Sequence, residues 1–444
     1  MADSNEKTIE PLPKVSFDKT ATNGEPPVFD PSELGVLTKD GMRLHPQPTS
    51  DPLDPLNWTS LRKHGILAIV MSLYFMFTYI TTTTVPSFPE IQEQYGIDIA
   101  QVNWTVAIPA LGLAVGPLLW SSPADIYGRR IIFIIGTVVA LAATIGAAAA
   151  PTYEGYMAAR FFQGLGVSPA ATVGLAIIND IFFEYQRGQK VGLWVLAIDM
   201  GLLVGPLIGG FLDLVSHYWI NWFTAILFGA ILLAEILFLP ETLYPRNTML
   251  VRMPYGDGVV HSASADIEKT TSRPSVAGDV ELPRTRTLPF ITYKPVPGMN
   301  HPKPWDSILR FIILWKFPAV AIAVFFYCFT WYWWVLSIIT MLPVAYIQYT
   351  PQIQGLLFLG LILGTLFSEA FLSGTTSDWL VAKLAKKNHN IRTPEMRLWL
   401  IYPAALLSSI GLIIWGISID MNYHWIVGQI AFFLFAAGIQ MGNT

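Results

Sequence analysis

Charged residues lie inside long apolar stretches of the sequence, among them Arg160, Asp199, Glu235 and Glu369. In hydrocarbon, each such charge costs about 2.5 to 3.5 kcal/mol on insertion scales, and these residues usually handle ions or substrates. Asp199 lies near the middle of its stretch, too far from either end for a short side chain to reach water. We therefore expect Asp199 to bind and release a proton, with a structural hydrogen bond as the alternative. Glu235 and Glu369 either share this role or stay solvated near the ends of their stretches.

Other chemistries find no support in the sequence. No nucleophile–base pair is recognisable and no phosphate-cradling loop precedes a lysine, so the chain is predicted not to be an enzyme or a P-loop ATPase. The single cysteine, Cys328, excludes a disulfide framework and a cysteine-based metal site, and we expect neither a metal nor a cofactor. A net charge of -4 gives no indication of nucleic-acid binding. Without an ATP-binding loop, the energy source is predicted to be an ion gradient.

The elements that must position these residues are membrane-spanning helices. Hydrophobic residues make up 53% of the chain and charged residues only 13%, with a mean hydropathy of +0.47. Soluble chains average about 25% charged residues, and a bilayer core needs about 20 apolar residues per helix. The sequence thus predicts an all-α polytopic membrane protein with ten spans, at residues 64–85, 101–120, 131–150, 156–183, 190–214, 218–239, 317–347, 352–372, 398–419 and 425–444.

Basic residues divide the loops into two alternating sets. The loops after the second, fourth, sixth and eighth spans carry Lys and Arg, whereas those after the odd-numbered spans carry none. The positive-inside rule places the basic loops and both termini in the cytosol, and the plasma membrane is the default for a protein of this kind. Two stretches without apolar periodicity are predicted to be a disordered cytosolic tail, 1–60, and a cytosolic linker, 244–305. The tail precedes an N-terminal half at 61–243, and the linker separates this half from a C-terminal half at 306–444.

Two loops that lie six spans apart share an acidic residue followed by basic ones. The first reads SSPADIYGRR and contains Asp125, Gly128, Arg129 and Arg130; the second reads SGTTSD, ends on Asp378, and is followed by lysines. Two related halves are a plan of secondary transporters, with the substrate site between them near mid-membrane. A carboxylate and two arginines at helix ends can lock helices together through charge-assisted hydrogen bonds and dipole contacts. A loop that only sets topology is the alternative.

The first of these loops resembles a loop of the major facilitator superfamily, and residues 54–444 are similar to its fungal drug:proton antiporters of the twelve-helix type. The resemblance implies a major facilitator fold of two six-helix halves, with the second half truncated to four helices. It also implies a gating loop formed by Asp125, Gly128, Arg129, Arg130 and Asp378. Ser121 departs from the glycine that the family usually has there.

Two further motifs carry the resemblance. The sequence RFFQGLG from Arg160 implies that this arginine takes part in proton coupling; the alternative is that its side chain reaches the outer interface. The fifth span has glycines four apart, which let another backbone approach closely, and a proline that can bend the helix. These residues are Gly201, Gly205, Pro206, Gly209 and Gly210. In the family this helix packs against the eighth, which carries Gly360 and Gly364, so we expect a sliding contact between the halves. Ordinary helix packing is the alternative.

A dense aromatic cluster begins the second half of the sequence. Aromatic rings in a cavity suit flat, apolar or cationic compounds, through buried area and cation–π attraction. We assign to the substrate cavity Gln163, Tyr327, Trp331, Trp334 and Glu369. Packing of the aromatic rings against lipid or neighbouring helices is the alternative, since only some positions of a helix can face a cavity.

The expected function is proton-coupled export of small amphiphilic organic compounds, such as drugs, toxins or fungal secondary metabolites, by alternating access. The protein is expected to work as a monomer in the lipid bilayer. One alternative is a proton-coupled importer of organic cations or polyamines, in which Asp199 and Glu369 bind the cation. Another is a transport-impaired truncated product, because the family's partner for Asp125 lies on a helix beyond the four predicted in the second half.

Overall fold

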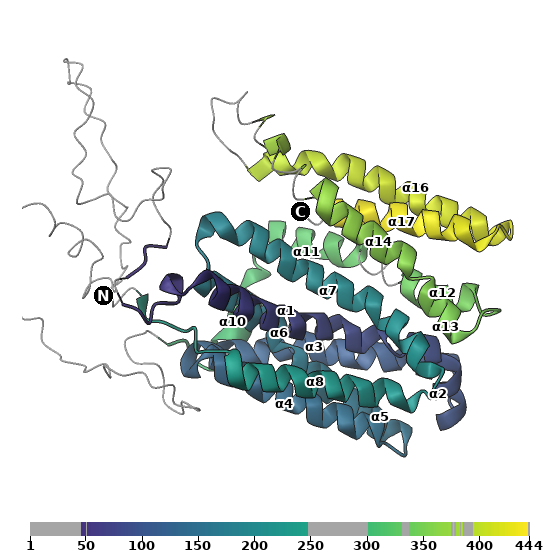
Figure 1. Ribbon diagram of the computed structural model, residues 1–444, viewed down its shortest axis with the longest axis horizontal. Helices are drawn as coiled ribbons and strands as arrows, with labels where there is room; N and C mark the ends of the chain where they lie inside the picture. Colours follow the sequence, from purple (N-terminus) through teal and green to yellow (C-terminus); the bar gives the residue numbers. More distant parts are fainter. Residues whose placement is uncertain are drawn as a thin grey trace, which may run out of the picture.

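The computed structural model describes residues 46–49, 51–246, 301–330, 337–373 and 394–442, and parts of 376–384. Long helices run side by side in two groups, one from each half of the sequence, as Figure 1 shows. The long helix α7 of the first group lies on the side that faces the second group. The fold is therefore all-helical in the described residues, as the composition predicts.

The first group holds the N-terminal half. Its helices are α1 (Ser60–Thr82), α2 (Phe88–Tyr95), α3 (Ile99–Tyr127), α4 (Arg129–Ala148), α5 (Tyr153–Val167), α6 (Pro169–Ile181), α7 (Glu184–Asp213) and α8 (Tyr218–Phe238). Short 3₁₀ turns precede α1 at Pro55–Asn57 and follow it at Val85–Ser87.

The C-terminal half supplies the remaining helices. They are α10 (Asp306–Leu314), α11 (Pro318–Thr330), α12 (Ser337–Ala345), α13 (Pro351–Leu356), α14 (Leu359–Phe367), a π-helical turn (Ser368–Ser373), a 3₁₀ segment (Pro394–Leu400), α16 (Ile401–Asp420) and α17 (Trp425–Gly442). Helix α17 packs on both α14 and α16, and these three helices form the core of the second group.

The helices that can span a membrane nearly match the predicted ten. By length and apolar composition, nine helices or continuous helix pairs in the described residues qualify, and ten do if the α10–α11 pair is one bent span. The predicted span at 317–347 begins at α11, and the preceding helix α10 meets α11 at 92°. Pro318 begins α11, and proline fits the first turn of a helix because it has no N–H to donate to a preceding turn. The chain therefore bends at the start of the predicted span.

The predicted fourth span is present as one span over Tyr153–Ile181, in which α5 passes into α6 at Ser168 and Pro169. Proline at this position cannot donate to the carbonyl of Leu165, four residues earlier. That carbonyl instead accepts hydrogen bonds from Trp120 Nε1 of α3, at 2.9 Å, and from Ser168 Oγ, at 2.6 Å. The carbonyl of Leu165, which lacks its helical donor, thus joins α5 to α3. In a membrane interior, every backbone polar group must find a hydrogen-bond partner within the protein.

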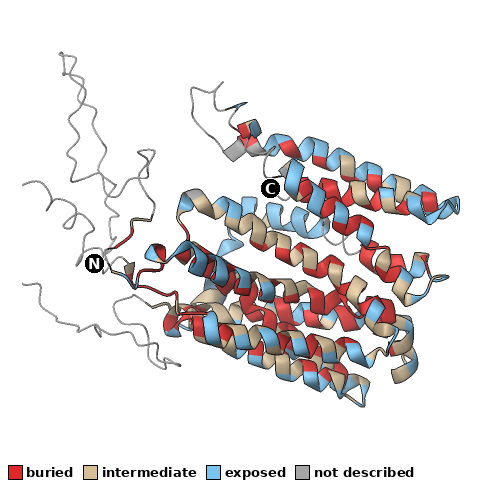
Figure 2. Cartoon of the chain, in the orientation of Figure 1, coloured by how far each residue is buried: buried red, intermediate tan, exposed pale blue. Residues whose placement is uncertain are grey.

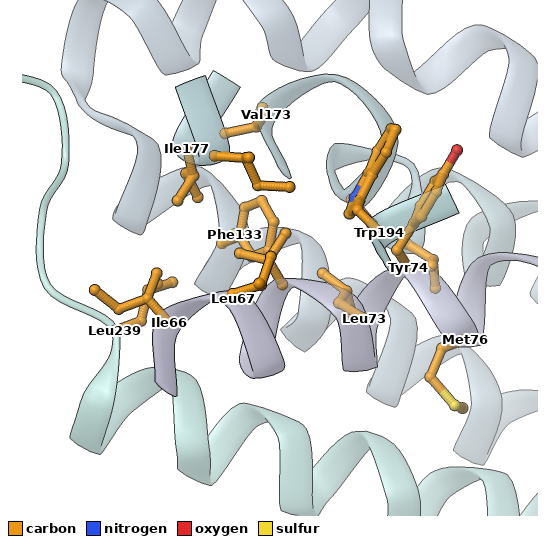
Figure 3. Packing of buried hydrophobic residues seen from close by; sticks show 14 of the residues in the cluster. Ile66, Leu67, Leu73, Tyr74, Met76, Phe133, Val173, Ile177, Trp194 and Leu239 are labelled. Atoms are coloured by element: carbon orange, nitrogen blue, oxygen red, sulfur yellow. The ribbon is translucent and has the colours of Figure 1, made fainter. Parts of the chain in front are cut away.

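Burial follows the contacts between helices. Buried residues lie where helices face one another, and exposed residues lie on the outer faces, as Figure 2 shows. Figure 3 shows the core of the first group, where Leu67, Phe133 and Ile177 from three different helices meet. The outer faces carry large exposed apolar side chains, such as Ile226 and Leu237 on α8. An exposed apolar surface around the whole molecule is what lipid requires, and the chain is a multi-pass membrane protein.

Candidate functional site

A cavity lies between the two groups of helices, near the middle of α7. It is small, with a volume of about 40 Å³, below the roughly 300 to 1,000 Å³ typical of small-molecule sites. Helices α7, α12, α14 and α17 supply its walls, with Asp199, Leu202, Leu203, Ile338, Ile339, Leu361, Thr365, Phe435, Ala436, Ile439 and Gln440. Both halves of the sequence therefore contribute to one mostly apolar cavity.

Asp199 is the charged residue among those lining this cavity. Its side chain is 8% exposed, and its Oδ2 atom is buried without a hydrogen-bond partner among the described residues. Two groups lie within electrostatic range of Asp199, Tyr74 of α1 and Glu369 of the π-helical turn. The ring of Tyr74 is stacked on Trp194 with centroids 3.9 Å apart, as Figure 3 shows. Sequence reasoning found this residue, but whether it carries a proton stays a prediction.

Glu369 approaches the cavity from the other half of the chain. Its Oε2 atom accepts a hydrogen bond from Gln440 Nε2 at 2.9 Å, and Gln440 lines the cavity. A side chain at Gly192 of α7 would lie 3.7 Å from Glu369 Oε1, so this carboxylate faces the first group. The structure thus brings Asp199 and Glu369, which are far apart in sequence, to the same interface.

The glycine strip of α7 packs differently from our expectation. Gly201, Gly205 and Gly209 all face α1, and a Cβ at Gly201 or Gly209 would overlap a backbone carbonyl of that helix. Residues four apart share one face of a helix, and here that face is directed at a neighbour in the same half. The expected sliding contact between halves is therefore wrong for these three glycines.

Contacts between the halves involve other small residues. A Cβ at Gly210 would lie 2.5 Å from Pro351 O of α13, and one at Gly355 would lie 2.8 Å from Pro206 O of α7. Gly360 and Gly364 were expected to face the fifth span, but they face α17, at Gln429 and Phe433. The strip in the eighth span therefore joins helices of its own half, and α13 rather than α14 approaches α7 most closely.

Hydroxyl groups at the C-terminal end of α1 donate hydrogen bonds to backbone carbonyls of α7. Pro206 cannot donate to the carbonyl of Leu202, and that carbonyl accepts a hydrogen bond from Thr82 Oγ1 at 3.0 Å. Thr78 Oγ1 donates to Ile198 O and Thr83 Oγ1 donates to Gly205 O, at 2.5 and 2.9 Å. These bonds fix α7, and with it Asp199, against α1.

Arg160 and Gln163 lie inside the first group. Arg160 is 1% exposed and donates to Thr105 O through Nε and NH2, at 3.4 and 3.2 Å; Pro109 cannot donate to that carbonyl. Arg160 NH1 donates to Gln163 Oε1 at 2.7 Å, and Gln163 Nε2 donates to Thr144 Oγ1 at 2.8 Å. Assignment of Gln163 to the cavity was therefore wrong, because its amide is used between α4 and α5. A role of Arg160 in proton coupling stays a prediction.

Glu235 is another buried carboxyl group, away from the cavity. It is fully buried on α8 and accepts a hydrogen bond from Thr137 Oγ1 of α4 at 2.8 Å. The solvated position considered for it is excluded by this burial. Its neighbours indicate a contact between α4 and α8.

At one end of the molecule, which we call the basic end, the predicted gating loop lies among charged partners. Arg129 NH1 lies 2.9 Å from Asp180 Oδ2 of α6, in a pair not aligned as a hydrogen bond, and Arg129 NH2 lies 3.8 Å from Asp125 Oδ1. Glu241 caps α4, accepting from the backbone N–H groups of Arg129 and Arg130 at 3.0 and 3.2 Å. A carboxylate at a helix N-terminus is favoured by the helix dipole. Gly128 precedes α4 with a φ of 113°, a backbone region that favours glycine.

A second set of bonds at the basic end joins the segment before α1 to the segment after α8. Asp54 is fully buried and accepts from Thr49 N, Leu56 N and Arg246 NH2, at 2.9, 3.0 and 3.2 Å. Arg246 NH2 also donates to Asp180 O at 3.3 Å. Residues 46–49 and 51–59, which we assigned to the disordered tail, thus include buried, hydrogen-bonded positions.

Tyr244 strengthens the same connection. Its hydroxyl donates to Asp51 Oδ2 at 2.9 Å and lies 3.2 Å from Thr49 Oγ1. Burial, with a smaller contribution from Asp51, raises the pKa of Tyr244 to about 12, so its hydroxyl remains a donor. We call Asp54, Asp125, Arg129, Asp180, Glu241 and Arg246 the basic-end cluster.

The aromatic cluster is only partly described. Tyr327 is 58% exposed on α11 and lies within electrostatic range of Tyr74. Trp331, Trp334 and Asp378 lie outside the described residues. In the described ranges, no three His, Cys, Asp or Glu side chains come together to hold a metal ion.

Sequence reasoning missed most of the cavity wall and four of the six residues of the basic-end cluster. Gln440 and Thr365 lie in apolar stretches with no motif to mark them. Asp180 and Arg246 stand next to predicted span ends, where charged residues are common, so their pairing could not be distinguished from ordinary solvation. The proline at 169 was the available signal of the junction between α5 and α6 within the fourth span.

Comparisons with known proteins agree with this architecture. A family profile described as Major Facilitator Superfamily matches residues 67–444. The chain is 29% identical over 400 residues to the MFS-type efflux pump MFS2 of Trichophyton rubrum, covering 88% of this chain and 62% of that protein. It is 27% identical over 440 residues to the efflux pump radE of Floropilus chiversii, covering 96% of this chain and 75% of that protein.

A solved structure supports the fold alone. The xylose transporter XylE from E. coli, in a partially occluded inward open conformation, aligns with a TM-score of 0.58 at 15% identity, covering 86% of this chain and 83% of that one. The family profile covers most of the sequence, and the helix arrangement agrees with it. The chain therefore belongs to the Major Facilitator Superfamily.

Proposed function

We propose that the protein exports small amphiphilic organic compounds in exchange for protons, by alternating access between its two halves. The observation that carries the proposal is Asp199, a deep carboxyl group whose Oδ2 atom has no hydrogen-bond partner within the described structure and which lines a mostly apolar cavity between the halves. An acid in such a place can gain and lose a proton as access alternates. Relatives named as efflux pumps favour export.

The contacts between the halves support alternating access. Gly210 with Pro351, and Gly355 with Pro206, bring α7 and α13 together at the end of the molecule opposite to the basic end. Contact at one end is what one state of a rocking cycle requires, with the site between the halves exposed to the other side. The positive-inside rule assigns the basic end to the cytosol, so this state would be open to the cytosol.

A transport measurement tests the proposal. The chain is reconstituted in proteoliposomes with an imposed pH gradient, and movement of a neutral dye, Nile red, and a cationic dye, rhodamine 6G, is recorded. We expect at least one dye to move against its own gradient, to stop with a protonophore, and to lose its dependence on the pH gradient in Asp199→Asn. Movement that ignores the pH gradient in the unmodified protein would contradict proton coupling.

A second candidate is import of organic cations by the same scaffold. The observation that favours it is the pair of carboxylates at the interface, Asp199 and Glu369, without a lysine, arginine or histidine among the residues known to line the cavity. Cells that express the chain distinguish the two directions. Export lowers the accumulation of rhodamine 6G relative to cells with an empty vector, whereas import raises it.

A further inference from the structure

We propose that α10 lies along the cytosolic surface of the membrane and binds the headgroups of anionic phospholipids through Arg310 and Lys316. This surface lies outside the central cavity and has no part in the proposed exchange of a compound for a proton. The inference therefore stands or falls independently of the proposed function, and its test measures no transport.

The direction of α10 is the first step. It meets α11 at 92°, and α11 begins the apolar stretch that we predicted to cross the membrane. A helix at a right angle to a membrane-spanning helix runs along the membrane plane.

Hydrogen bonds to α3 set the depth of α10. Ser307 Oγ lies 2.6 Å from Ser122 Oγ, and Ser307 N donates to the same oxygen at 3.3 Å. Ser122 stands five residues before the end of α3 at the basic end, roughly 7.5 Å at 1.5 Å per residue. Helices that lie in the membrane surface bury their apolar face by about 5 to 10 Å. The depth of α10 therefore matches that of an interfacial helix.

The apolar side chains of α10 lack a cover of protein. No residue of this helix is buried, and Ile312 and Leu309 are 60% and 53% exposed. Asp306, Ser307 and Arg310 stand three and four residues apart and share one polar face. A helix with one polar face and an otherwise apolar surface fits the boundary between headgroups and acyl chains.

Two tryptophans mark the ends of α10. Trp305 precedes the helix and Trp315 follows it, and both are largely exposed. Tryptophan is enriched at the interface between membrane and water, because its ring is apolar and its N–H is polar. Both ends of α10 thus carry a side chain suited to the same level of the membrane.

The charges of this segment indicate which lipids it binds. Exposed cations outnumber carboxylates here, with Lys303, Arg310 and Lys316 against Asp306. Asp306 Oδ2 is used at the start of the helix, where it accepts from Lys303 N at 3.0 Å. Ion pairs among the described residues involve Arg129 and Arg246 instead of these cations. Because the cytosolic leaflet carries anionic lipids, their headgroups complement Arg310 and Lys316.

The test measures the lipid composition beside α10 in the 444-residue chain, reconstituted in phosphatidylcholine bilayers. Cys328, which is exposed on α11, is replaced by serine, and Ile312→Cys carries a bimane fluorophore. Nitroxide-labelled phosphatidylserine or phosphatidylcholine, at the same low mole fraction, quenches the fluorescence. We expect phosphatidylserine to quench about fivefold more strongly, the effect of one basic side chain near an anionic surface. About 1 M sodium chloride should remove this preference, because it screens exposed charges. In Arg310→Gln/Lys316→Gln the two lipids should quench equally.

A matched position and a matched charge provide the controls. Leu237, near the basic end of α8, is 61% exposed, and Arg130, which donates to Ile236 O there, is buried. Bimane on Leu237→Cys should be quenched equally by the two lipids, which also shows that the protein is inserted. Arg62→Gln removes an exposed cation of α1 and should leave the preference beside α10 unchanged.

Four results would overturn the inference. Equal quenching by the two lipids beside α10, or a preference that survives Arg310→Gln/Lys316→Gln, means that these cations bind no headgroup. Quenching of the fluorophore on α8 but not of that on α10 means that α10 lies outside the membrane. If soluble O-phosphoserine removes the preference, the site binds free phosphate compounds instead of a lipid surface.

Discussion

The basic-end cluster and the central cavity both place carboxylates out of water, but they treat them in opposite ways. In the cluster, Asp54 accepts from two backbone N–H groups and from Arg246, and Glu241 caps a helix. In the cavity, Asp199 Oδ2 has no such partner within the described structure. A carboxylate with all its partners stabilises the fold, whereas one without them remains available for a proton or a ligand. The difference separates the acids that hold the structure from Asp199, the acid that we propose binds a proton.

The largest effect should come from breaking the cluster. Arg246→Ala leaves Asp54 buried without its cation, and removing one partner of a buried pair typically costs about 3 to 5 kcal/mol. We expect the free energy of unfolding, measured by titration with SDS in mixed micelles, to fall by this amount. Arg62→Ala, which loses a cation–π contact 4.1 Å from the ring of Trp58, is the control and should change far less. If both variants lost the same free energy of unfolding, the buried pair of Arg246 with Asp54 would matter no more to stability than the peripheral Arg62.

A slightly smaller loss of stability should follow from placing a larger side chain in the contact between α1 and α7. Gly201→Val places a side chain into a backbone carbonyl of α1, and overpacking of this kind costs about 3 kcal/mol. Gly229→Val on α8 is the matched control, since nothing lies within 4 Å of its added Cβ. Thermal unfolding in detergent, followed by size-exclusion chromatography, compares the two. A normal melting temperature for Gly201→Val would mean that α1 and α7 are not in contact as described.

Within the basic-end cluster, a substitution that removes a charge but keeps the shape of the side chain should reduce stability less than Arg246→Ala. Glu241→Gln keeps one acceptor oxygen but loses the carboxylate at the N-terminus of α4, which we expect to cost about 1 to 2 kcal/mol. The SDS titration used for Arg246→Ala measures it. A loss as large as that of Arg246→Ala would show that Glu241, rather than the Asp54–Arg246 pair, is the centre of the cluster.

The smallest effect on stability should come from the cavity. Asp199→Asn removes no hydrogen bond from Oδ2 and relieves a buried charge, so stability should stay the same or rise by up to about 1 kcal/mol. The same substitution at Asp54 should reduce stability, which makes the two aspartates a direct test of the comparison. A marked destabilisation by Asp199→Asn would mean that this carboxylate has a structural partner after all.

Several features of the fold could be predicted from single residues. The low charge content and the apolar stretches predicted an all-helical membrane protein, and Asp199 was found because it stands alone near the middle of a stretch. The directions of the glycine strips could not be predicted. A spacing of four residues places Gly201, Gly205 and Gly209 on one face but does not say which neighbour that face meets. The prediction chose the other half of the protein, and the structure has α1.

The sequence by itself determined the solvent of this protein, because a chain with so few charges can bury its apolar surface only in lipid. It also determined the family resemblance and the position of Asp199, the acid for which a charge in hydrocarbon costs the most. Tertiary structure alone decided which polar groups find partners. Pro109, Pro169 and Pro206 each deprive a carbonyl of its helical donor, and only the packing of helices determined that Arg160, Trp120 and Thr82 would supply the missing hydrogen bonds. Asp199 Oδ2 received no such donor among the described residues, since the packing of α7 against α1 left it facing the cavity.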